Sequence, residues 1–371
     1  MIKFLPISQP SITQLEINYV TDVMKSGWVS SLGQYINKFE EGFADYCGTK
    51  YALTTANGTT GIHLALASYG ITAGDEVIIP DLTFIATASA VIYTGAKAVL
   101  VDIEEDTLCI DPLQVEKAIT EKTKAIIAVH LYGHPANMIA INELARKYNL
   151  IVVEDAAEAH GAAIKEQKVG SLANCGIFSF YGNKIITSGE GGMITTNDED
   201  FYQRAKYLRD HAMSSSKRYW HNEFGYNYRM TNMQAALGLA QLERIDELVD
   251  RKREIFSQYQ KNLSDFPGLK LNFTAEWAWN VYWMICLEVE GYTETQRNNL
   301  MQALKRQGID TRPYFYPLSD MPMYEAQAIP TPITHKVYQR GINLPSYFDL
   351  TNQDIDYICS SLRTCLENGD W

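Results

Sequence analysis

Short runs of β-branched residues alternate with longer helix-like stretches from about residue 50 onward, and this alternation constrains the fold most. The runs are YALTT, EVIIP, AVLVD, AIIAVH, IVVED, GIFSF and GMITT, beginning at residues 51, 76, 98, 125, 151, 176 and 192. Continuous apolar strands separated by helices are typical of a mostly parallel sheet covered on both faces. We therefore expect an α/β fold with a seven-stranded, mostly parallel sheet flanked by helices.

The remaining sequence predicts a second, smaller domain. Thr231 suits the N-cap of an amphipathic stretch that continues to about Leu263 and is expected to connect two domains. Beyond it, LKLNF, VYWMICLEV and TETQRNNLMQALKRQG predict further strands and a helix. We assign residues 1–245, with an N-terminal helix, to a large domain and residues 246–371 to a smaller C-terminal α/β domain.

Composition and charge exclude several classes of protein. With 46% apolar and 20% charged residues, the 371-residue chain has the composition of a folded globular protein. Its formal net charge of −12 disfavours nucleic acids and anionic membrane surfaces as partners. No secretory leader or membrane-length apolar window is apparent, and the six cysteines lack the spacing of a disulfide framework. We expect a cytoplasmic protein with reduced cysteines.

Open α/β sheets bind ligands at the carboxyl ends of their strands, so the residues at these ends are candidates for function. The stretch ANGTTG at residues 56–61 passes from a strand into a helix and predicts a phosphate cradle, although a simple helix cap is the alternative. His130 could be a general base, but it has no second histidine at metal-ligand spacing and no evident Ser or Cys partner. No metal site is expected, and a core histidine, or one beside a bound cofactor, is preferred. The other polar residues at strand ends are Asp81, Asp102, Glu154 and Asp155.

Lys184 lies in SFYGNKIITSGEGG, a glycine-rich loop between two predicted strands. A lysine desolvated beside aromatic residues can attack a carbonyl as the free amine, whereas an exposed loop lysine is the simpler alternative. The neighbouring candidates favour a reactive lysine, because Asp155, Glu158, Ser179 and the phosphate cradle are also predicted at strand ends. A lysine, a carboxylate, phosphate donors and an aromatic residue are what pyridoxal 5'-phosphate (PLP) requires.

The chain resembles the DegT-type nucleotide-sugar aminotransferases, a family of fold-type-I PLP-dependent transferases. The resemblance runs from SGWVSSLGQYINKFEEGFADYCG to INLPSYFDLT and includes AVHLYGHPANM, RYWHNEFGYNYRMTNMQAALGLAQLERID and TRPYFYPLSDMPMY. It implies that Lys184 forms the Schiff base with PLP and that Asp155 keeps the pyridine nitrogen protonated. Glu158 matches a position that meets the phenolic oxygen of the cofactor.

The resemblance also assigns the remaining contacts to cofactor and substrates. Gly58, Thr59 and Ser179 match the phosphate cradle, and Phe84 matches the aromatic residue that stacks on the ring. The family lends two residues across a homodimer interface, and these match Asn227, toward the cofactor phosphate, and Arg229, toward the carboxylate of the amino donor. His160 and Tyr316 are candidates for contact with the sugar.

The expected reaction moves the amino group of glutamate to a 4-keto sugar attached to a nucleoside diphosphate. GDP-4-dehydro-6-deoxymannose is the preferred substrate, with polysaccharide biosynthesis, such as that of O-antigen, as the use. A dTDP- or UDP-linked 4-keto sugar is the main alternative. A family dehydratase would carry histidine in place of Lys184, and a non-catalytic sensor would be expected to have lost Lys184, Asp155 or Arg229.

An aromatic cluster in the predicted small domain has two interpretations. It could stack on a nucleobase, but packing within the domain is preferred. Its members are Trp277, Trp279, Tyr282 and Trp283.

Overall fold

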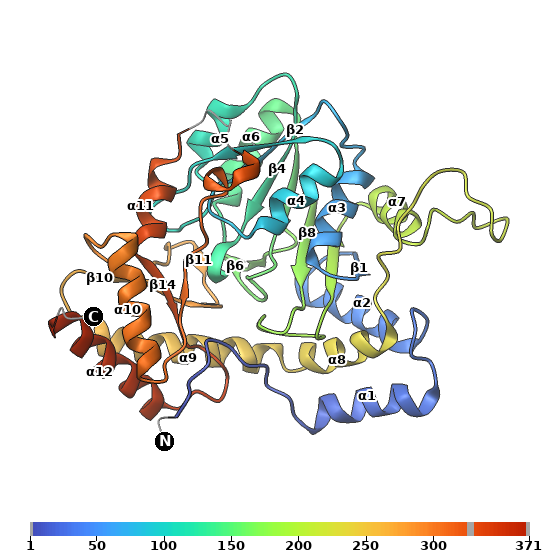
Figure 1. Ribbon diagram of the computed structural model, residues 1–371. Helices are drawn as coiled ribbons and strands as arrows, with labels where there is room; N and C mark the ends of the chain where they lie inside the picture. Colours follow the sequence, from blue (N-terminus) through green and yellow to red (C-terminus); the bar gives the residue numbers. More distant parts are fainter. Residues whose placement is uncertain (1–2, 325–329, 369–371) are drawn as a thin grey trace.

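The large domain is built on a seven-stranded sheet in a computed structural model that describes residues 3–324 and 330–368 (Figure 1). All seven predicted strands are present, in the spatial order β1-β9-β8-β5-β4-β2-β3. Only β9 runs antiparallel to its neighbours within this sheet, which confirms the mostly parallel arrangement. The bounds are β1 Tyr51–Thr55, β2 Glu76–Pro80, β3 Lys97–Val101, β4 Thr123–Val129, β5 Ile151–Asp155, β8 Cys175–Ser179 and β9 Gly192–Thr196.

Helices cover both faces of this sheet, and the strands are therefore apolar on both sides. Along β4, Ile126 and Ala128 belong to one core cluster, whereas Ala125 and Ile127 belong to the other. The first cluster includes residues of α1 Gln14–Ser26, α2 Gln34–Cys47, α5 Pro112–Ala118, α6 Met138–Tyr148 and α8 Asn232–Leu242. The second includes residues of α3 Gly58–Ser68, α4 Ile85–Tyr93 and α7 Glu199–Arg209.

A four-stranded antiparallel sheet forms the core of the C-terminal part, in the order β10-β12-β14-β13. Leu5 packs into the same core, and its N–H donates a 2.8 Å hydrogen bond to Gly308 O. The elements here are α9 Ile245–Leu263, β10 Leu269–Leu271, β12 Ile285–Val289, α10 Glu294–Arg306, β13 Arg312–Pro313, α11 Pro332–Arg340, β14 Gly341–Leu344 and α12 Asn352–Asn368. The division at residues 245/246 stays a prediction.

A small three-stranded sheet connects the two parts of the chain. It consists of β6 Ala163–Ile164, β7 Gln167–Lys168 and β11 Ala278–Trp279, in the order β11-β6-β7. Its strand β11 comes from the C-terminal part, whereas β6 and β7 follow β5 of the large sheet.

The amphipathic stretch from Thr231 to Leu263 forms two helices, α8 and α9, rather than one. Thr231 caps α8 as predicted, with Gln234 completing a capping box. The helix breaks at Arg244, whose backbone (φ −113°, ψ 9°) leaves the helical region. The Arg244 guanidinium binds Glu16 at 2.8 Å, so a contact with the N-terminal helix accompanies the break.

Two strand-end carboxylates of the large sheet hold the segment that follows β13. Asp81 accepts hydrogen bonds from Ser319 N and Oγ at 2.8 and 2.7 Å. Asp102 accepts from Ile333 N at 2.9 Å and from Thr334 N at 2.8 Å, which are free N–H groups of the first turn of α11. These carboxylates therefore have a structural role.

All six cysteines are buried, as predicted for core thiols, and unpaired. Across residues 3–324 and 330–368, no helix has both the length and the apolar character needed to cross a membrane.

Candidate active site

Asp155 is the last residue of β5 and lies buried at the carboxyl end of the large sheet. Its Oδ2 accepts a 2.8 Å hydrogen bond from Thr87 Oγ1, and its Oδ1 accepts one of 3.2 Å from Ala157 N. Burial raises the pKa of Asp155, and the hydrogen bond from Thr87 opposes that shift. A buried carboxylate with spare acceptor capacity is suited to a cationic partner.

Lys184 lies in the connection between β8 and β9, and its side chain is only 11% exposed. Its Nζ is 3.4 Å from Oε1 of Glu158 and 4.0 Å from the centre of the Trp283 ring. Burial raises the pKa of Glu158, and the Lys184 charge opposes that shift. The other oxygen of Glu158 accepts a 3.0 Å hydrogen bond from Tyr132 N. Lys184 is therefore not the solvated loop lysine that was the simpler alternative.

The predicted phosphate cradle lies where α3 begins. Asn57 caps the helix through a capping box with Thr60, so Gly58 and Thr59 are its first two residues. A Cβ on Gly58 would lie 3.0 Å from Cβ of Ser179, the last residue of β8. The absence of a side chain at Gly58 thus lets Ser179 approach the positive end of α3, where backbone N–H groups are free.

Phe84 immediately precedes α4, and 56% of the residue is exposed. Its ring centre is 5.8 Å from that of Phe315, which stacks on Tyr132 at 5.5 Å. Tyr316, the predicted sugar contact, turns toward Tyr338 instead, with ring centres 5.9 Å apart. Phe315 is therefore the aromatic neighbour of Phe84 in this segment, and sequence reasoning missed it.

His160 is completely buried against Phe178 and Phe180, with ring centres 5.4 and 5.8 Å apart. Neither ring nitrogen has a hydrogen-bond partner among the residues that the structure describes. Burial lowers the pKa of His160 to about 3, and the charge of Lys184 acts in the same direction. Contact between His160 and a sugar stays a prediction, and this burial does not favour it.

Asn227 and Arg229 make their polar contacts with residues outside the Lys184 group. The backbone of Asn227 pairs with Asp210, and the guanidinium of Arg229 binds Asp210 and Oγ of Ser31, the latter at 3.1 Å. Ala56 N donates a 2.8 Å hydrogen bond to Tyr228 O, so this segment passes the start of the phosphate cradle. The proposed role of both residues in a partner subunit stays a prediction.

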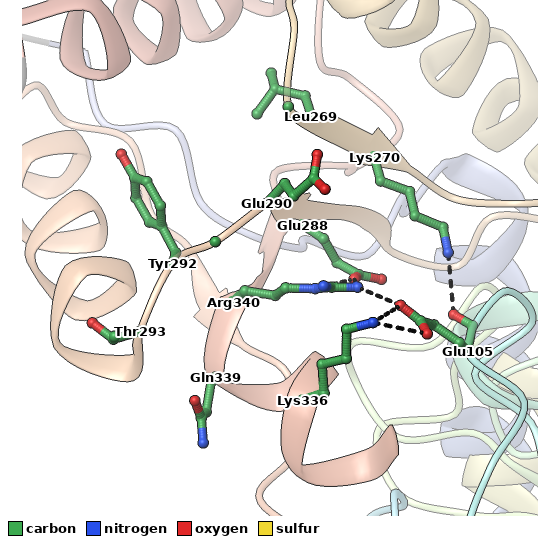
Figure 2. Close-up of a pocket in the computed structure, with 12 residues that line it drawn as sticks. Glu105, Leu269, Lys270, Glu288, Glu290, Tyr292, Thr293, Lys336, Gln339 and Arg340 are labelled. Carbon is green, nitrogen blue, oxygen red and sulfur yellow. Dashed lines mark hydrogen bonds and ion pairs between the residues drawn. The ribbon is translucent and has the colours of Figure 1, made fainter. Parts of the chain in front are cut away.

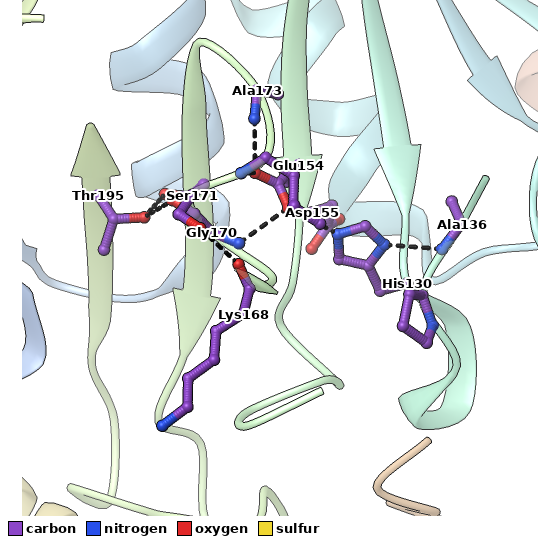
Figure 3. Close-up of polar contacts among 12 residues, drawn as sticks. His130, Ala136, Glu154, Asp155, Lys168, Gly170, Ser171, Ala173 and Thr195 are labelled. Atoms are coloured by element: carbon purple, nitrogen blue, oxygen red, sulfur yellow. Dashed lines mark hydrogen bonds and ion pairs between the residues drawn. The ribbon is translucent and has the colours of Figure 1, made fainter. Parts of the chain in front are cut away.

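His130 is a core histidine, as preferred from the sequence (Figure 3). Its Nδ1 accepts a 3.0 Å hydrogen bond from Ala136 N, so Nε2 carries the hydrogen that points at Glu154, 3.1 Å away. Glu154 also accepts from the backbone N–H groups of Gly170, Leu172 and Ala173. This buried network fixes the loop between β7 and β8.

A groove of about 720 Å³ lies elsewhere, between β10, β12 and α11 (Figure 2). Arg340 binds Glu288 and Glu105, and Lys336 also binds Glu105. Lys270 pairs with Asp106. These cations are engaged in ion pairs that join the C-terminal part to the segment after β3. We therefore assign the groove a structural role and place the candidate active site at Lys184.

Thr87 and Trp283 are two further contacts of this site that sequence reasoning missed. Thr87 lies four residues after Thr83, which precedes α4, and this spacing could have indicated a polar face at the start of the helix. Trp283 was assigned to packing in the small domain, and no local pattern connects it to Lys184. Its position follows only from tertiary structure.

Comparison with known proteins places these residues in a family. The model of the DegT/DnrJ/EryC1/StrS aminotransferase family matches residues 10–363. The chain is 45% identical to the GDP-perosamine synthase of Escherichia coli O157:H7 and 44% identical to that of Caulobacter vibrioides, with 98% of each chain covered in both cases. The solved PLP form of Spr1654 from Streptococcus pneumoniae has a TM-score of 0.94 and 29% identity, covering 99% of this chain and 100% of that one. The chain therefore belongs to the DegT/DnrJ/EryC1/StrS aminotransferase family.

Proposed function

We propose that the protein is a PLP-dependent aminotransferase that moves the amino group of glutamate to the 4-keto carbon of GDP-4-dehydro-6-deoxymannose, giving GDP-perosamine. The observation that best supports this proposal is the position of the Lys184 amine, which packs against Glu158 and Trp283 within the same site as Asp155. The two relatives named GDP-perosamine synthase support the choice of sugar and nucleotide.

The residues present fit PLP. Asp155 is a buried carboxylate that suits a protonated pyridine nitrogen, and Glu158 is a buried carboxylate with a raised pKa that suits a shared proton. The absence of a Cβ at Gly58 lets Ser179 lie close to the start of α3, beside free N–H groups that suit a phosphate. Phe84 offers an exposed ring for stacking.

PLP when bound supplies an electron sink for the carbon whose C–H bond is broken. Asp155 would maintain that sink by keeping the ring nitrogen protonated, and Gly58, Thr59 and Ser179 would hold the phosphate. Lys184 would hold the cofactor at rest, and its free amine would take the proton from the α-carbon of glutamate on Nζ. Burial of this amine excludes water, which would otherwise compete for the proton.

A homodimer with shared active sites is part of the proposal. The arm between α7 and α8, residues 211–228, projects from the body of the chain in Figure 1. Its Phe224 is fully exposed and its Tyr219 is 76% exposed, which supports burial against a second subunit. In that subunit Asn227 would reach the phosphate and Arg229 the carboxylate of glutamate. A cytoplasmic location also stays a prediction.

The decisive experiment incubates the purified chain with PLP, glutamate and GDP-, dTDP- or UDP-linked 4-keto sugars, and identifies products by mass spectrometry. We expect amination of the GDP sugar, and borohydride should fix the cofactor on Lys184. Lys184→Ala should be inactive. A label on another lysine would contradict the site, whereas turnover of only a dTDP or UDP sugar would contradict the substrate alone.

Subunit mixing tests the shared site. Lys184→Ala and Arg229→Ala, each inactive alone, should regain activity on exchange, because one site of each mixed dimer carries neither change. Random pairing of equal amounts gives up to about a quarter of wild-type activity. Mixtures that remain inactive despite proven exchange would mean that Arg229 acts in its own subunit or has no role in the site.

A further inference from the structure

Trp283 makes two contacts with the loop between β8 and β9 that carries Lys184, although it comes from the C-terminal part of the chain. Its indole Nε1 donates a 2.8 Å hydrogen bond to the carbonyl of Asn183, the residue before Lys184. Its ring face lies 4.0 Å from Nζ of Lys184. The residue is 3% exposed. A single side chain therefore fixes both the backbone and the amine of the lysine.

The backbone of Trp283 is itself fixed from two sides. Its carbonyl accepts hydrogen bonds from Nζ of Lys252 at 3.0 Å and from Oγ of Ser346 at 3.1 Å. Lys252 is buried in α9 and also donates to Oγ of Ser346 at 2.9 Å. Buried lysines are rare unless their polar head has partners, and this amine finds them in the carbonyls of Trp283 and Ser346 and in the Ser346 hydroxyl.

The opposite side of Trp283 is closed by the turn after β4. Gly133 has φ +103°, and a Cβ there would lie 2.7 Å from Trp283 N. Tyr132 stacks on the indole with ring centres 6.3 Å apart, and its N–H donates to Glu158, the ion-pair partner of Lys184. The same turn thus contacts Trp283 and Glu158.

We propose that Trp283 is a positioning residue that holds the ε-amine of Lys184 beside Glu158 in the orientation needed for proton transfer. The inference rests on the proposed function for Lys184. Lysine has a flexible four-carbon stem, and a cation over an aromatic face together with a fixed backbone restricts it. The position of the reacting amine then depends on α9 and on the segment after β14, through Lys252 and Ser346, as well as on the large sheet.

Two substitutions separate the contacts. Trp283→Phe retains a ring but removes the N–H donor, and we expect the rate of the glutamate half-reaction to fall about 2- to 12-fold, the range for one hydrogen bond. Trp283→Leu also removes the ring, which adds a further loss of about 2- to 30-fold. Trp279→Phe is the matched control, because Trp279 is 46% exposed and stacks on Arg253 instead.

Single-turnover measurements with glutamate and α-deuterated glutamate distinguish positioning from loss of structure. Poor positioning slows proton transfer itself, so the isotope effect should rise in Trp283→Phe while KM for glutamate and cofactor content stay near wild type. If the wild type is active and both Trp283 variants have an unchanged rate and isotope effect, the inference is overturned. Wild-type protein without aminotransfer activity would instead contradict the proposed function.

A second readout needs no activity. In full-length protein freed of cofactor, reductive methylation with ¹³C-formaldehyde labels lysines, and the Lys184 signal is assigned by its absence in Lys184→Arg. We expect the indole to shift this signal upfield, and Trp283→Leu to remove the shift. If Trp283→Leu does not fold, the inference is still tested by the position of the Lys184 signal in the wild type and in Trp283→Phe. A wild-type Lys184 signal at the position of exposed lysines would overturn the inference.

Discussion

Glu154→Gln is a near-isosteric change for which the structure predicts a large effect. Oε1 of Glu154 accepts hydrogen bonds from Leu172 N and Ala173 N at 2.8 and 3.0 Å. Oε2 accepts from Gly170 N at 2.8 Å and from Nε2 of His130 at 3.1 Å. Each oxygen thus faces two donors (Figure 3), and neither position can hold an NH₂ group.

His130 cannot relieve the conflict by exchanging its tautomer. Its Nδ1 accepts the hydrogen bond from Ala136 N, so a hydrogen on Nδ1 would face another donor. Glutamine at position 154 therefore loses two hydrogen bonds in either orientation. Hydrogen bonds to a charged group contribute about 1.5–3 kcal/mol each, so the expected loss of stability is about 3–6 kcal/mol.

The assay is amide hydrogen exchange combined with urea unfolding of cofactor-free protein at one fixed concentration, since ligand binding and dimerisation change apparent stability. Exchange should accelerate about 10²- to 10⁴-fold either at Leu172 and Ala173 together or at Gly170, according to the orientation of the amide. Glu166→Gln, at an exposed position, is the control. Exchange rates of all three amides within about fivefold of wild type would refute the reasoning. A fivefold change corresponds to a free energy of about 1 kcal/mol, which is far less than the loss of two such hydrogen bonds.

Three further predictions concern the carboxylates of Asp155 and Asp102 and the imidazole of His134. Asp155→Asn retains shape but not charge, so the single-turnover rate with glutamate should fall more than the affinity for PLP; an unaltered rate would show that the charge has no role. Asp102→Ala leaves two N–H groups of α11, one buried and one part-buried, without an acceptor and should cost about 2–4 kcal/mol in urea unfolding, with Asp102→Asn costing less. Burial lowers the pKa of His134 to about 4 from its ordinary 6.5. As the pH falls, the unfolded chain takes up a proton on His134 before the folded chain does. The free energy of unfolding should therefore fall by up to about 3 kcal/mol between pH 6.5 and 4, and His134→Asn should reduce this pH dependence.

The seven strands of the large sheet were predictable because each is buried on both faces. Such strands leave an unbroken apolar run in the sequence, and Ala125 to Ala128 divide alternately between the two core clusters. The cap of α8 at Thr231 was predictable for a similar reason, because a capping box involves residues only three apart. The resemblance to a family selected Lys184, Asp155 and Glu158, and the structure then shows the contact between Lys184 and Glu158.

Contacts between distant segments could not be predicted in this way. The break between α8 and α9 accompanies a bond from Arg244 to Glu16, more than two hundred residues away in sequence. The first turn of α11 takes its acceptor from Asp102 at the end of β3, so no residue near α11 indicates where its cap lies. Sequence periodicity records only which faces are buried, not against which segment.

Trp283 shows this limit within the site. As a large apolar side chain before a buried strand it predicted packing, and the sequence alone determined that it would be buried. That it is buried against Lys184, with its N–H on Asn183, depends on how the C-terminal sheet docks on the large one. Local sequence therefore determined the elements and the chemistry available at strand ends, whereas the long-range packing decided which side chain orients the reacting amine.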